Sequence, residues 1–470
     1  MRPRTSTFLH VLVGVVVLTA LVAGCSDDKD SSSSSSTTAA STGGKAGVIR
    51  VPADQPTIQK AVDAAKAGDL VLVSPGTYKE AVDVTTADIT IRGLDRNKVI
   101  LEGGFKLENG IRILDTDGVV VENMTARNYL SNGFYWTGSD HYRGSYLTAY
   151  RNGDYGIYAF DAYHGQFDHA YASGSPDAGF YIGECFECDA VLDQVVSEYN
   201  GLGYSGTNSG GELYIVNSEF MNNRAGIVPN SGSYELCYPG RSNTIVGNMV
   251  HDNNYLKGPG IDVSLIAQGN GILMAGSINN IVERNRVWNH DRTGIASVPF
   301  PEDDASDTPP DASELSTPCD ETKDQPVPED KVGLVLWNAT GNRVVGNVVE
   351  ASGMADLASA TIPDEANGIT LEGLNNCFSG NTFTTSSPTD AEKLAPCDGE
   401  GNGGDFNAGS LDLVKLIADQ PPKPEKDLYK TTPVPGAQEN MPDAATAPAP
   451  RFTTPTKPDV DAIKVPGKPK

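Results

Sequence analysis

The sequence predicts a single all-β domain, a parallel β-helix in which a short segment winds into one coil after another. Three observations predict this solenoid: a period of 23 residues, an apolar position that recurs once per period, and a recurring pair of asparagines. The chain has 470 residues, of which 50 are glycine and 39% are hydrophobic. Such a composition is typical of a turn-rich β protein rather than a helical one.

The period is marked by a glycine that precedes an apolar residue at the start of each expected strand. Six consecutive copies are spaced 23, 23, 23, 24 and 23 residues apart, and a later pair is again 23 apart. These glycines are Gly110, Gly133, Gly156, Gly179, Gly203, Gly226, Gly271 and Gly294, and Gly333 and Gly368 follow at longer gaps. A leucine-rich repeat has a similar length, but its leucine pattern is absent.

The residue after each glycine predicts an inward ladder that forms the core, because equivalent residues of successive coils lie about 4.8 Å apart. The ladder reads Ile111, Phe134, Ile157, Phe180, Tyr204, Ile227, Ile272, Ile295, Leu334 and Ile369. The segments "NTIVGN", "NIVERN", "NRVVGN" and "NCFSGN" each carry two asparagines five residues apart. We expect these asparagines to hydrogen-bond from coil to coil in the turns.

The N-terminal residues predict export and lipid attachment. Arg2 and Arg4 precede the apolar run 11–23, which is too short to span a membrane comfortably. The following "VAGC" resembles a bacterial lipobox, which implies that residues 1–24 are a lipoprotein signal peptide and that Cys25 carries the lipid. The chain would then be anchored at the extracellular face of the cell membrane. A plain signal peptide with a chance cysteine is the alternative.

Composition divides the rest of the chain. Residues 25–47 are rich in serine and threonine and have nothing apolar to bury, so they predict a disordered tether. Residues 417–470 are rich in proline and predict a disordered tail. Residues 48–416 remain as the β-helix domain, with insertions expected near 255–268 and 299–331.

The start of this domain predicts a capping helix, with Thr57 as its N-cap and Gly68 as its stop. A cap protects the exposed edge of the first strands from aggregation. The stretch "VPADQPTIQKAVDAAKAGDLVLVSPGTYKE", followed by "ITIRGLDRNKVILEGG", closely resembles the cap and first coils of bacterial right-handed parallel β-helix repeat proteins of the pectin-lyase-like superfamily. The resemblance covers about residues 51–383 and implies a right-handed helix.

That superfamily includes polysaccharide lyases, polygalacturonases, pectin methylesterases and uronan epimerases, as well as members that only bind. The chain lacks the Trp-Ile-Asp-His, Gly-His-Gly, Asp-Phe-Ile-Phe-Gly and Asp-Pro-His-Asp motifs of these four enzyme classes. The resemblance therefore assigns no catalytic residue to this chain.

Outward columns of the repeat predict a surface instead. Sugar rings stack on aromatic faces, and carboxylates and imidazoles bond sugar hydroxyls. The residues expected to bind a polysaccharide on this basis are Tyr135, Tyr158, Tyr181, Asp115, Asp140 and Glu184. The candidates for general acid–base catalysis beside them are Asp161, His141, His164 and Arg143.

The same residues have a structural explanation, because stacked tyrosines stabilise β-helices and turn aspartates bond local backbone. Stacked carboxylates could also hold Ca²⁺ through oxygen ligands, although we assign no metal site. Two classes of function remain. The chain is either a lipid-anchored extracellular protein that binds a polysaccharide, and as an enzyme cleaves it as a lyase or glycoside hydrolase, or a non-catalytic cell-surface scaffold or adhesion protein.

Six cysteines lie in the domain, and export would place them in an oxidising compartment that favours disulfides. The preferred pairs are Cys185–Cys188, Cys237–Cys319 and Cys377–Cys397, with a zinc site at "CFEC" as the rival for the first. The net charge of -26 argues against a nucleic-acid partner and against charge-driven adhesion to anionic lipid. The acidity is explained by solubility, and we expect a monomer.

Overall fold

A computed structural model of the chain describes residues 47–302, 319 and 335–469. Cys25, the signal peptide, the tether up to residue 46, Leu334 and most of the acidic insertion lie outside the described residues. Within the described part of the chain, no helix combines the length and the apolar character that crossing a membrane requires.

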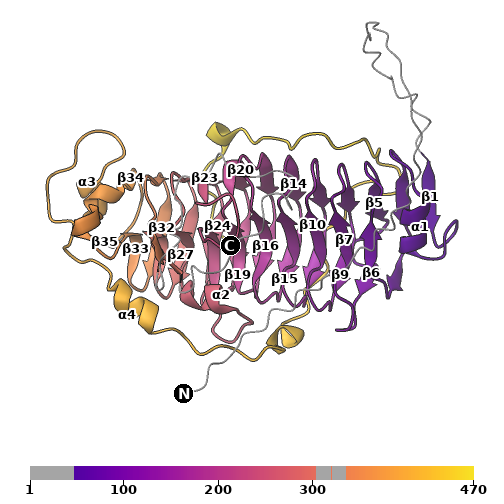
Figure 1. Cartoon of the computed structure of the whole chain (residues 1–470), viewed down its shortest axis with the longest axis horizontal. Coiled ribbons are helices and arrows are strands. Elements are labelled where there is room, and N and C mark those ends of the chain that lie inside the picture. The colour runs from indigo at the N-terminus through magenta and orange to yellow at the C-terminus, as the bar shows by residue number, and fades with distance from the viewer. Residues whose placement is uncertain (1–46, 303–318, 320–334, 470) are drawn as a thin grey trace, which may run out of the picture. The chain divides into compact units, whose positions relative to one another are not determined.

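The described chain is a right-handed parallel β-helix, as the repeat predicts. Each regular coil contributes one strand to each of three parallel sheets, which contain 12, 11 and 10 strands (Figure 1). We name these sheets A, C and B. Along one coil the chain passes from sheet C to sheet A to sheet B, and then enters sheet C of the next coil.

Sheet A consists of β1 (Val48–Val51), β2 (Leu70–Val73), β5 (Thr90–Gly93), β8 (Val120–Glu122), β11 (Arg143–Ser145), β14 (Gly165–Asp168), β17 (Ala190–Asp193), β20 (Gly210–Val216), β23 (Arg241–Val246), β26 (Ile281–Glu283), β31 (Arg343–Val345) and β34 (Cys377–Ser379). Sheet C consists of β4 (Val82–Val84), β7 (Ile111–Leu114), β10 (Phe134–Thr137), β13 (Ile157–Phe160), β16 (Ala178–Gly183), β19 (Leu202–Thr207), β22 (Ala225–Asn230), β25 (Ile272–Ala275), β28 (Thr293–Val298), β33 (Ala355–Ser359) and β35 (Ser386–Ser387).

Sheet B consists of β3 (Gly76–Tyr78), β6 (Val99–Glu102), β9 (Thr125–Arg127), β12 (Thr148–Tyr150), β15 (Tyr171–Ser173), β18 (Val196–Glu198), β21 (Glu219–Met221), β24 (Met249–His251), β27 (Arg286–His290) and β32 (Val348–Ser352). The strands β29 (Phe300–Glu302) and β30 (Val335–Trp337) form a separate antiparallel pair. The helices are α1 (Ile58–Ala64), α2 (Asp262–Ile266), α3 (Ala391–Leu394) and α4 (Leu413–Ala418), and short 3-10 helices are η3 (Glu365–Asn367), η4 (Glu372–Leu374), η5 (Leu428–Thr431) and η6 (Val460–Ala462).

The inward ladder of sheet C is confirmed up to Ile295. Each of its members from Ile111 to Ile295 pairs in register with the next coil and is fully buried. Leu357 of β33, and not Ile369, lies next to Ile295. The prediction for Ile369 is wrong because the longer gap after β28 separates the glycine marker from the strand register, and Ile369 lies partly exposed in a bridge to Asp364.

Two asparagine ladders are also confirmed. The Nδ2 atom of Asn248 donates to Oδ1 of Asn285 at 3.0 Å, and Asn285 donates in the same way to Asn347 at 3.0 Å. Asn285 also donates to the backbone oxygen of Ile245 at 2.9 Å. A parallel ladder joins Asn243, Asn280, Asn342 and Asn376. These amides satisfy buried turn backbone that has no partner in a sheet.

The first end of the stack is capped by α1, and α3 and β35 lie at the opposite end (Figure 1). Thr57 is the N-cap of α1, and its side chain accepts from the backbone nitrogen of Lys60 at 3.1 Å, as predicted. The helix ends at Ala64, earlier than expected, because Ala65 is extended. Gly68 instead takes a left-handed φ of 91° in the turn before β2.

The six cysteines form the three expected disulfides. The Cys185–Cys188 bridge closes a corner that is longer than its neighbours. The strand register shows this, because the step along the chain from Gln166 to its partner Val191 is longer than the step from Arg143 to its partner Gln166. The Cys237–Cys319 bridge joins the loop that follows β22 to Cys319. A disulfide at "CFEC" removes the zinc alternative, since both thiols are consumed.

The C-terminal segment differs from the expected disordered tail. We call residues 432–466 the strap, because they extend along the β-helix and have little regular structure (Figure 1). Arginines of the coils donate to its backbone oxygens: Arg151 to Thr432, Arg96 to Glu439, Arg92 to Ala447 and Pro448, Arg284 to Val460, and Arg286 to Pro466. A proline-rich extended segment leaves its carbonyls unpaired, and guanidinium groups satisfy them.

Replacing Asn285 by alanine tests the asparagine ladders. The substitution leaves buried backbone and amide groups of two coils without partners, so the free energy of unfolding should fall by about 2–4 kcal/mol. Denaturant unfolding measures this loss. Asn402→Ala, at an exposed position outside the helices and strands, is the control and should stay within about 0.5 kcal/mol of the parent. Equal stability of Asn285→Ala and the parent would contradict a structural role for the ladder.

Candidate functional site

The predicted tyrosine strip lies on the outward face of sheet C. Tyr135, Tyr158 and Tyr181 pair in register across β10, β13 and β16. Their ring centroids are 4.9 Å and 4.8 Å apart, with interplanar angles of 3° and 13°. The rings therefore cover each other's faces and turn their edges and hydroxyls outward. The expected stacking of sugar rings on these faces is wrong for the interior of the strip.

Exposure changes along the strip. Tyr135 and Tyr158 are half-buried, and among the described residues neither hydroxyl has a hydrogen-bond partner. Burial raises the pKa of the Tyr158 hydroxyl well above its usual value. Tyr181 is 1% exposed, because the loop after β22 covers it. The Tyr181 hydroxyl donates to the carboxylate of Glu235 at 2.7 Å. The open part of the strip is thus the part over β10 and β13.

Carboxyl groups with raised pKa values flank the strip. Glu184 is fully buried after β16, and its Oε1 accepts from the backbone nitrogen of Leu236 at 2.9 Å. Burial, with the nearby charge of Asp161, raises the pKa of Glu184 to about 8. Burial and the charge of Glu184 raise the pKa of Glu235 well above its usual value. Glu184 is therefore mostly protonated at pH 7.

A second acidic pair lies on the other side of the strip. The hydroxyl of Tyr155 donates to Oδ2 of Asp177 at 2.6 Å, and its ring contacts those of Tyr158 and Tyr181 at 4.7 Å and 4.9 Å. Burial, with the charge of Asp154, raises the pKa of Asp177 to about 8. Burial alone raises the pKa of Asp154 to about 6. Asp177 is therefore mostly protonated at pH 7, whereas Asp154 is mostly ionised.

Sequence reasoning missed Asp154, Tyr155, Asp177 and Glu235. A signal was available for two of them, because Asp154 and Asp177 each stand two residues before a repeat glycine. Glu235 comes from a loop outside the repeat, so the period could not assign it to this face. Its placement depends on tertiary contacts, among them the bond from Leu236 to Glu184.

The remaining predicted carboxylates occupy turn positions after the strands of sheet C. Asp115, Asp161 and Glu184 all have left-handed φ values, of 46°, 45° and 51°. Asp115 is exposed and Asp161 is buried. Over the described residues, these carboxylates form no group of three close enough to hold a metal ion. The columns therefore do not make the calcium site that oxygen ligands would require.

Arg143 lies on a different face, the outward side of sheet A. Its Nε atom donates to Oδ2 of Asp168 at 2.9 Å, and its Nη2 atom donates to Oδ1 at 3.2 Å. Together with Glu122 and Gln166 it lines a cavity of about 480 Å³ that the strap closes. A guanidinium held in two charge-assisted bonds is an anchor rather than a base, so the catalytic expectation for Arg143 has no support in this geometry.

Asp140, His141 and His164 meet at the corner between sheets C and A. The two imidazole rings are 4.9 Å apart, and Nδ1 of His164 lies 2.5 Å from Oδ1 of Asp140. In the next coil the register places Asp189 beside His164, and Glu187 is exposed in the longer corner. The predicted catalytic residues are therefore divided between the strip, this corner and sheet A.

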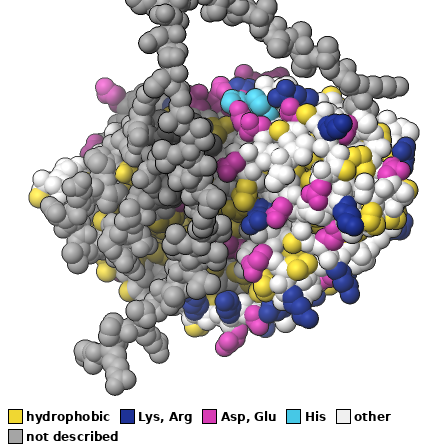
Figure 2. All heavy atoms as spheres, turned by 45° about the vertical axis from the view of Figure 1, so that its right-hand side comes forward, with side chains coloured by type: hydrophobic (Ala, Val, Ile, Leu, Met, Phe, Trp, Pro, Cys, Tyr) yellow, Lys and Arg dark blue, Asp and Glu magenta, His cyan; other side chains and the backbone are white. Residues whose placement is uncertain are grey.

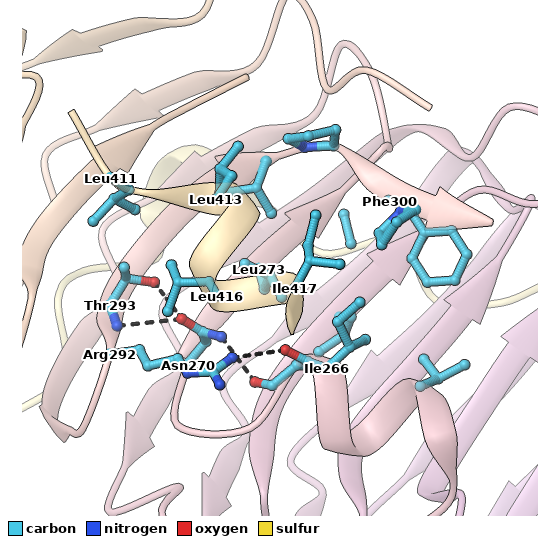
Figure 3. A pocket seen from close by; sticks show the side chains of 17 residues that line it. Ile266, Asn270, Leu273, Arg292, Thr293, Phe300, Leu411, Leu413, Leu416 and Ile417 are labelled. Carbon is cyan, nitrogen blue, oxygen red and sulfur yellow. Dashed lines mark hydrogen bonds between the residues drawn. The ribbon is translucent and has the colours of Figure 1, made fainter. Parts of the chain in front are cut away.

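An apolar pocket of about 60 Å³ lies between α2, α4 and the outward side of sheet C (Figure 3). Leu413, Leu416 and Ile417 of α4 point into it, and Arg292 closes one end through a bond from its Nη1 atom to the backbone oxygen of Ile266 at 2.9 Å. A volume of this size admits a few water molecules. The pocket is a packing contact of α4.

No family model matches the chain, and no curated protein matches it in sequence. Its fold is similar to that of the A-module of mannuronan C-5 epimerase AlgE4 of Azotobacter vinelandii, with a TM-score of 0.43, 13% identity, and coverage of 69% of this chain and 90% of that chain. It is also similar to pectate lyase Pel9A, with a TM-score of 0.40, 12% identity, and coverage of 85% and 90%. A rhamnogalacturonan lyase gives a TM-score of 0.43, 11% identity, and coverage of 69% and 89%. These are parallel β-helix proteins named as polysaccharide epimerases or lyases, and the likeness is one of fold.

The raised pKa of Glu184 predicts a pH dependence of stability. The native state keeps this proton where the unfolded state has lost it, so the free energy of unfolding falls as pH rises from 4.5 to about 8. Glu184→Gln stays neutral and should reduce this fall by about 1 kcal/mol or more, since one pKa unit corresponds to about 1.4 kcal/mol. Denaturant unfolding at several pH values measures the difference. Glu187→Gln, at an exposed position of the same corner, should leave the profile unchanged, and a profile unchanged by Glu184→Gln would contradict the raised pKa.

Proposed function

We propose that the chain binds an extended polysaccharide along the outward face of sheet C. One observation carries this proposal: Tyr158, whose ring is stacked between those of Tyr135 and Tyr181, lies beside the carboxyl groups of Glu184 and Glu235, whose pKa values burial raises. Clusters of groups with perturbed pKa values occur preferentially at functional sites. The repeat gives the face the linear form that a polymer needs, because every coil offers the same positions again.

The chemistry of this face suits sugars with hydroxyl or carboxylate groups. A protonated carboxyl group donates one hydrogen bond and accepts others, and a phenol does the same. Such groups match sugar hydroxyls, and they do not repel the carboxylate of a uronic acid as ionised side chains would. Binding therefore rests on hydrogen bonds from the tyrosine hydroxyls and from the carboxyl groups. Sugars do not stack on the faces that the three tyrosines turn to each other.

We further propose which residues would act if the bound polymer is cleaved. Hydrolysis of a glycosidic bond uses one protonated and one ionised carboxyl group. Glu235 is half-buried beside Tyr181, and burial with the charge of Glu184 raises its pKa well above the usual value, whereas the pKa of Asp154 is about 6. The environments of these two groups separate their pKa values in the manner that assigns acid and base roles. Glu235 is then the proton donor and Asp154 the base, which favours a hydrolase over a lyase.

One observation favours the alternative, a non-catalytic scaffold or adhesion protein. The tyrosine faces are satisfied by each other, and the hydroxyls of Tyr155 and Tyr181 are bonded internally. A strip that only stabilises the helix would have these same contacts. The two functions differ at Tyr135 and Tyr158, whose hydroxyls contribute nothing to the described internal hydrogen bonds.

We also propose that the protein works outside the cell, attached through a lipid on Cys25. The three disulfides among described residues support an oxidising compartment. Polymers of the cell surroundings would then reach the face of sheet C directly. Metabolic labelling with a fatty-acid analogue, compared between the parent and Cys25→Ser, reads out the attachment.

Retention of polysaccharides on immobilised protein tests the binding proposal. We expect the parent chain to retain a polyuronate or a neutral polysaccharide, and Tyr135→Phe with Tyr158→Phe to weaken that retention about tenfold. Phenylalanine keeps the ring stack, so thermal stability should not change. Tyr214→Phe, a tyrosine on sheet A, is the matched control. If the parent retains no polysaccharide, or the double variant retains it equally, the scaffold function is favoured.

The same samples test cleavage. New reducing ends without unsaturated products would indicate hydrolysis, and Glu235→Gln should abolish them while the polymer is still retained. Unsaturated ends would instead indicate a lyase and would overturn the roles proposed for Glu235 and Asp154. Polymer that stays intact would leave binding as the function.

A further inference from the structure

The corner between sheets C and A carries a column of residues in left-handed backbone conformations. His141, His164, Asp189 and Glu212 are equivalent in register, and their φ values are 57°, 52°, 44° and 51°. Gly118 occupies the same position in the preceding coil. Figure 2 shows histidine side chains beside acidic side chains at one edge of the visible face.

Three ligand atoms converge at this corner. Oδ1 of Asp140 lies 2.5 Å from Nδ1 of His164, and Oδ2 of Asp140 lies 3.6 Å from Nε2 of His141. One ligand atom from each of the three residues lies within 4.8 Å of the others. Each side chain is partly exposed, so a hydrated ion can reach the group.

We propose that Asp140, His141 and His164 bind one divalent transition-metal ion of the zinc, nickel and copper class. Imidazole nitrogen and carboxylate oxygen are ordinary zinc ligands, with bonds of about 2.0–2.2 Å. Two such ligands on a tetrahedral ion are separated by about 3.4 Å, which is close to the spacing of Asp140 and His141. His164 and Asp140 need to separate by only about 1 Å. Two nitrogen ligands out of three make calcium a poor occupant.

Neighbouring groups already orient these ligands. The backbone nitrogen of Asp140 donates to Oδ1 of Asp117 at 2.9 Å. Oδ2 of Asp189 lies 3.9 Å from Nε2 of His164, which leaves Nδ1 of that ring facing Asp140. Nδ1 of His141 is enclosed without a partner among the described residues, so Nε2 is the nitrogen turned to the ion. A carboxylate behind a metal-bound imidazole fixes its tautomer and orientation.

The strap lies beside this site. Nζ of Lys457 lies 3.3 Å from Oδ1 of Asp189 and also contacts the carboxylate of Glu212. An ion at the corner would therefore bind next to a contact that holds the strap to the coils. The corner lies on the far side of a turn from Tyr135 and Tyr158, so metal binding does not rest on the proposed polysaccharide site.

Isothermal titration calorimetry with zinc chloride tests the proposal. The protein is the chain without a polyhistidine tag, treated with a chelator and carrying Cys25→Ser, because the other six cysteines are paired. The test variant carries His141→Asn and His164→Asn, since asparagine tolerates a left-handed φ and removes the imidazole. The matched control is His169→Asn, because His169 has a φ of 50° at the next corner of the same coil.

We expect one zinc ion per chain and a higher thermal midpoint with zinc. The double variant should bind at least about tenfold more weakly and lose the thermal shift, while His169→Asn keeps both. Absence of saturable binding to the parent, or binding that the double variant retains, would overturn the site. If circular dichroism shows that the double variant misfolds, Asp140→Asn replaces it, and undiminished binding to Asp140→Asn would likewise overturn the site.

Discussion

In-register pairing between successive coils is the constraint on which the rest of this structure depends. It places each residue one strand spacing from the equivalent residue of the next coil. Each position of the repeat therefore favours residue types that interact well with a neighbour of the same type. Apolar residues gain from this, as in the buried run from Ile111 to Ile295. Asparagines gain as well, since one amide donates to the next. Stacked carboxyl groups are destabilised in their ionised form, because like charges approach each other.

This repulsion contributes to the raised pKa values of the carboxyl groups on the face of sheet C. Asp161 and Glu184 are equivalent turn positions of adjacent coils, and Asp154 and Asp177 are another such pair. Burial disfavours the charged form of each group, and the neighbour in the stack adds repulsion. A solenoid can thus hold protonated carboxyls at neutral pH without a dedicated active-site fold. The same stacking brings His141 and His164 together at the corner.

The sequence predicts what repeats and not what lies outside the repeat. The period placed the ladder through Ile295, the asparagine columns and the tyrosine strip, because each depends only on spacing. It failed at Ile369, where a long gap breaks the spacing. The strap escaped prediction because many of its contacts run through backbone carbonyls, which accept from arginines such as Arg92 and Arg96 and which composition does not reveal. The covered faces of the tyrosines likewise follow from ring orientation, which spacing does not encode.

Infrared difference spectroscopy at neutral pH tests the central claim, that stacking and burial keep carboxyls of this face protonated. The difference spectrum is the spectrum of the parent chain minus that of the variant carrying both Glu184→Gln and Asp177→Asn. The account predicts that it contains the carbonyl stretch of a protonated carboxylic acid at pH 7. This band should fade as pH rises through about 8, where both pKa values lie. A difference spectrum at pH 7 that contains only carboxylate bands would contradict the account.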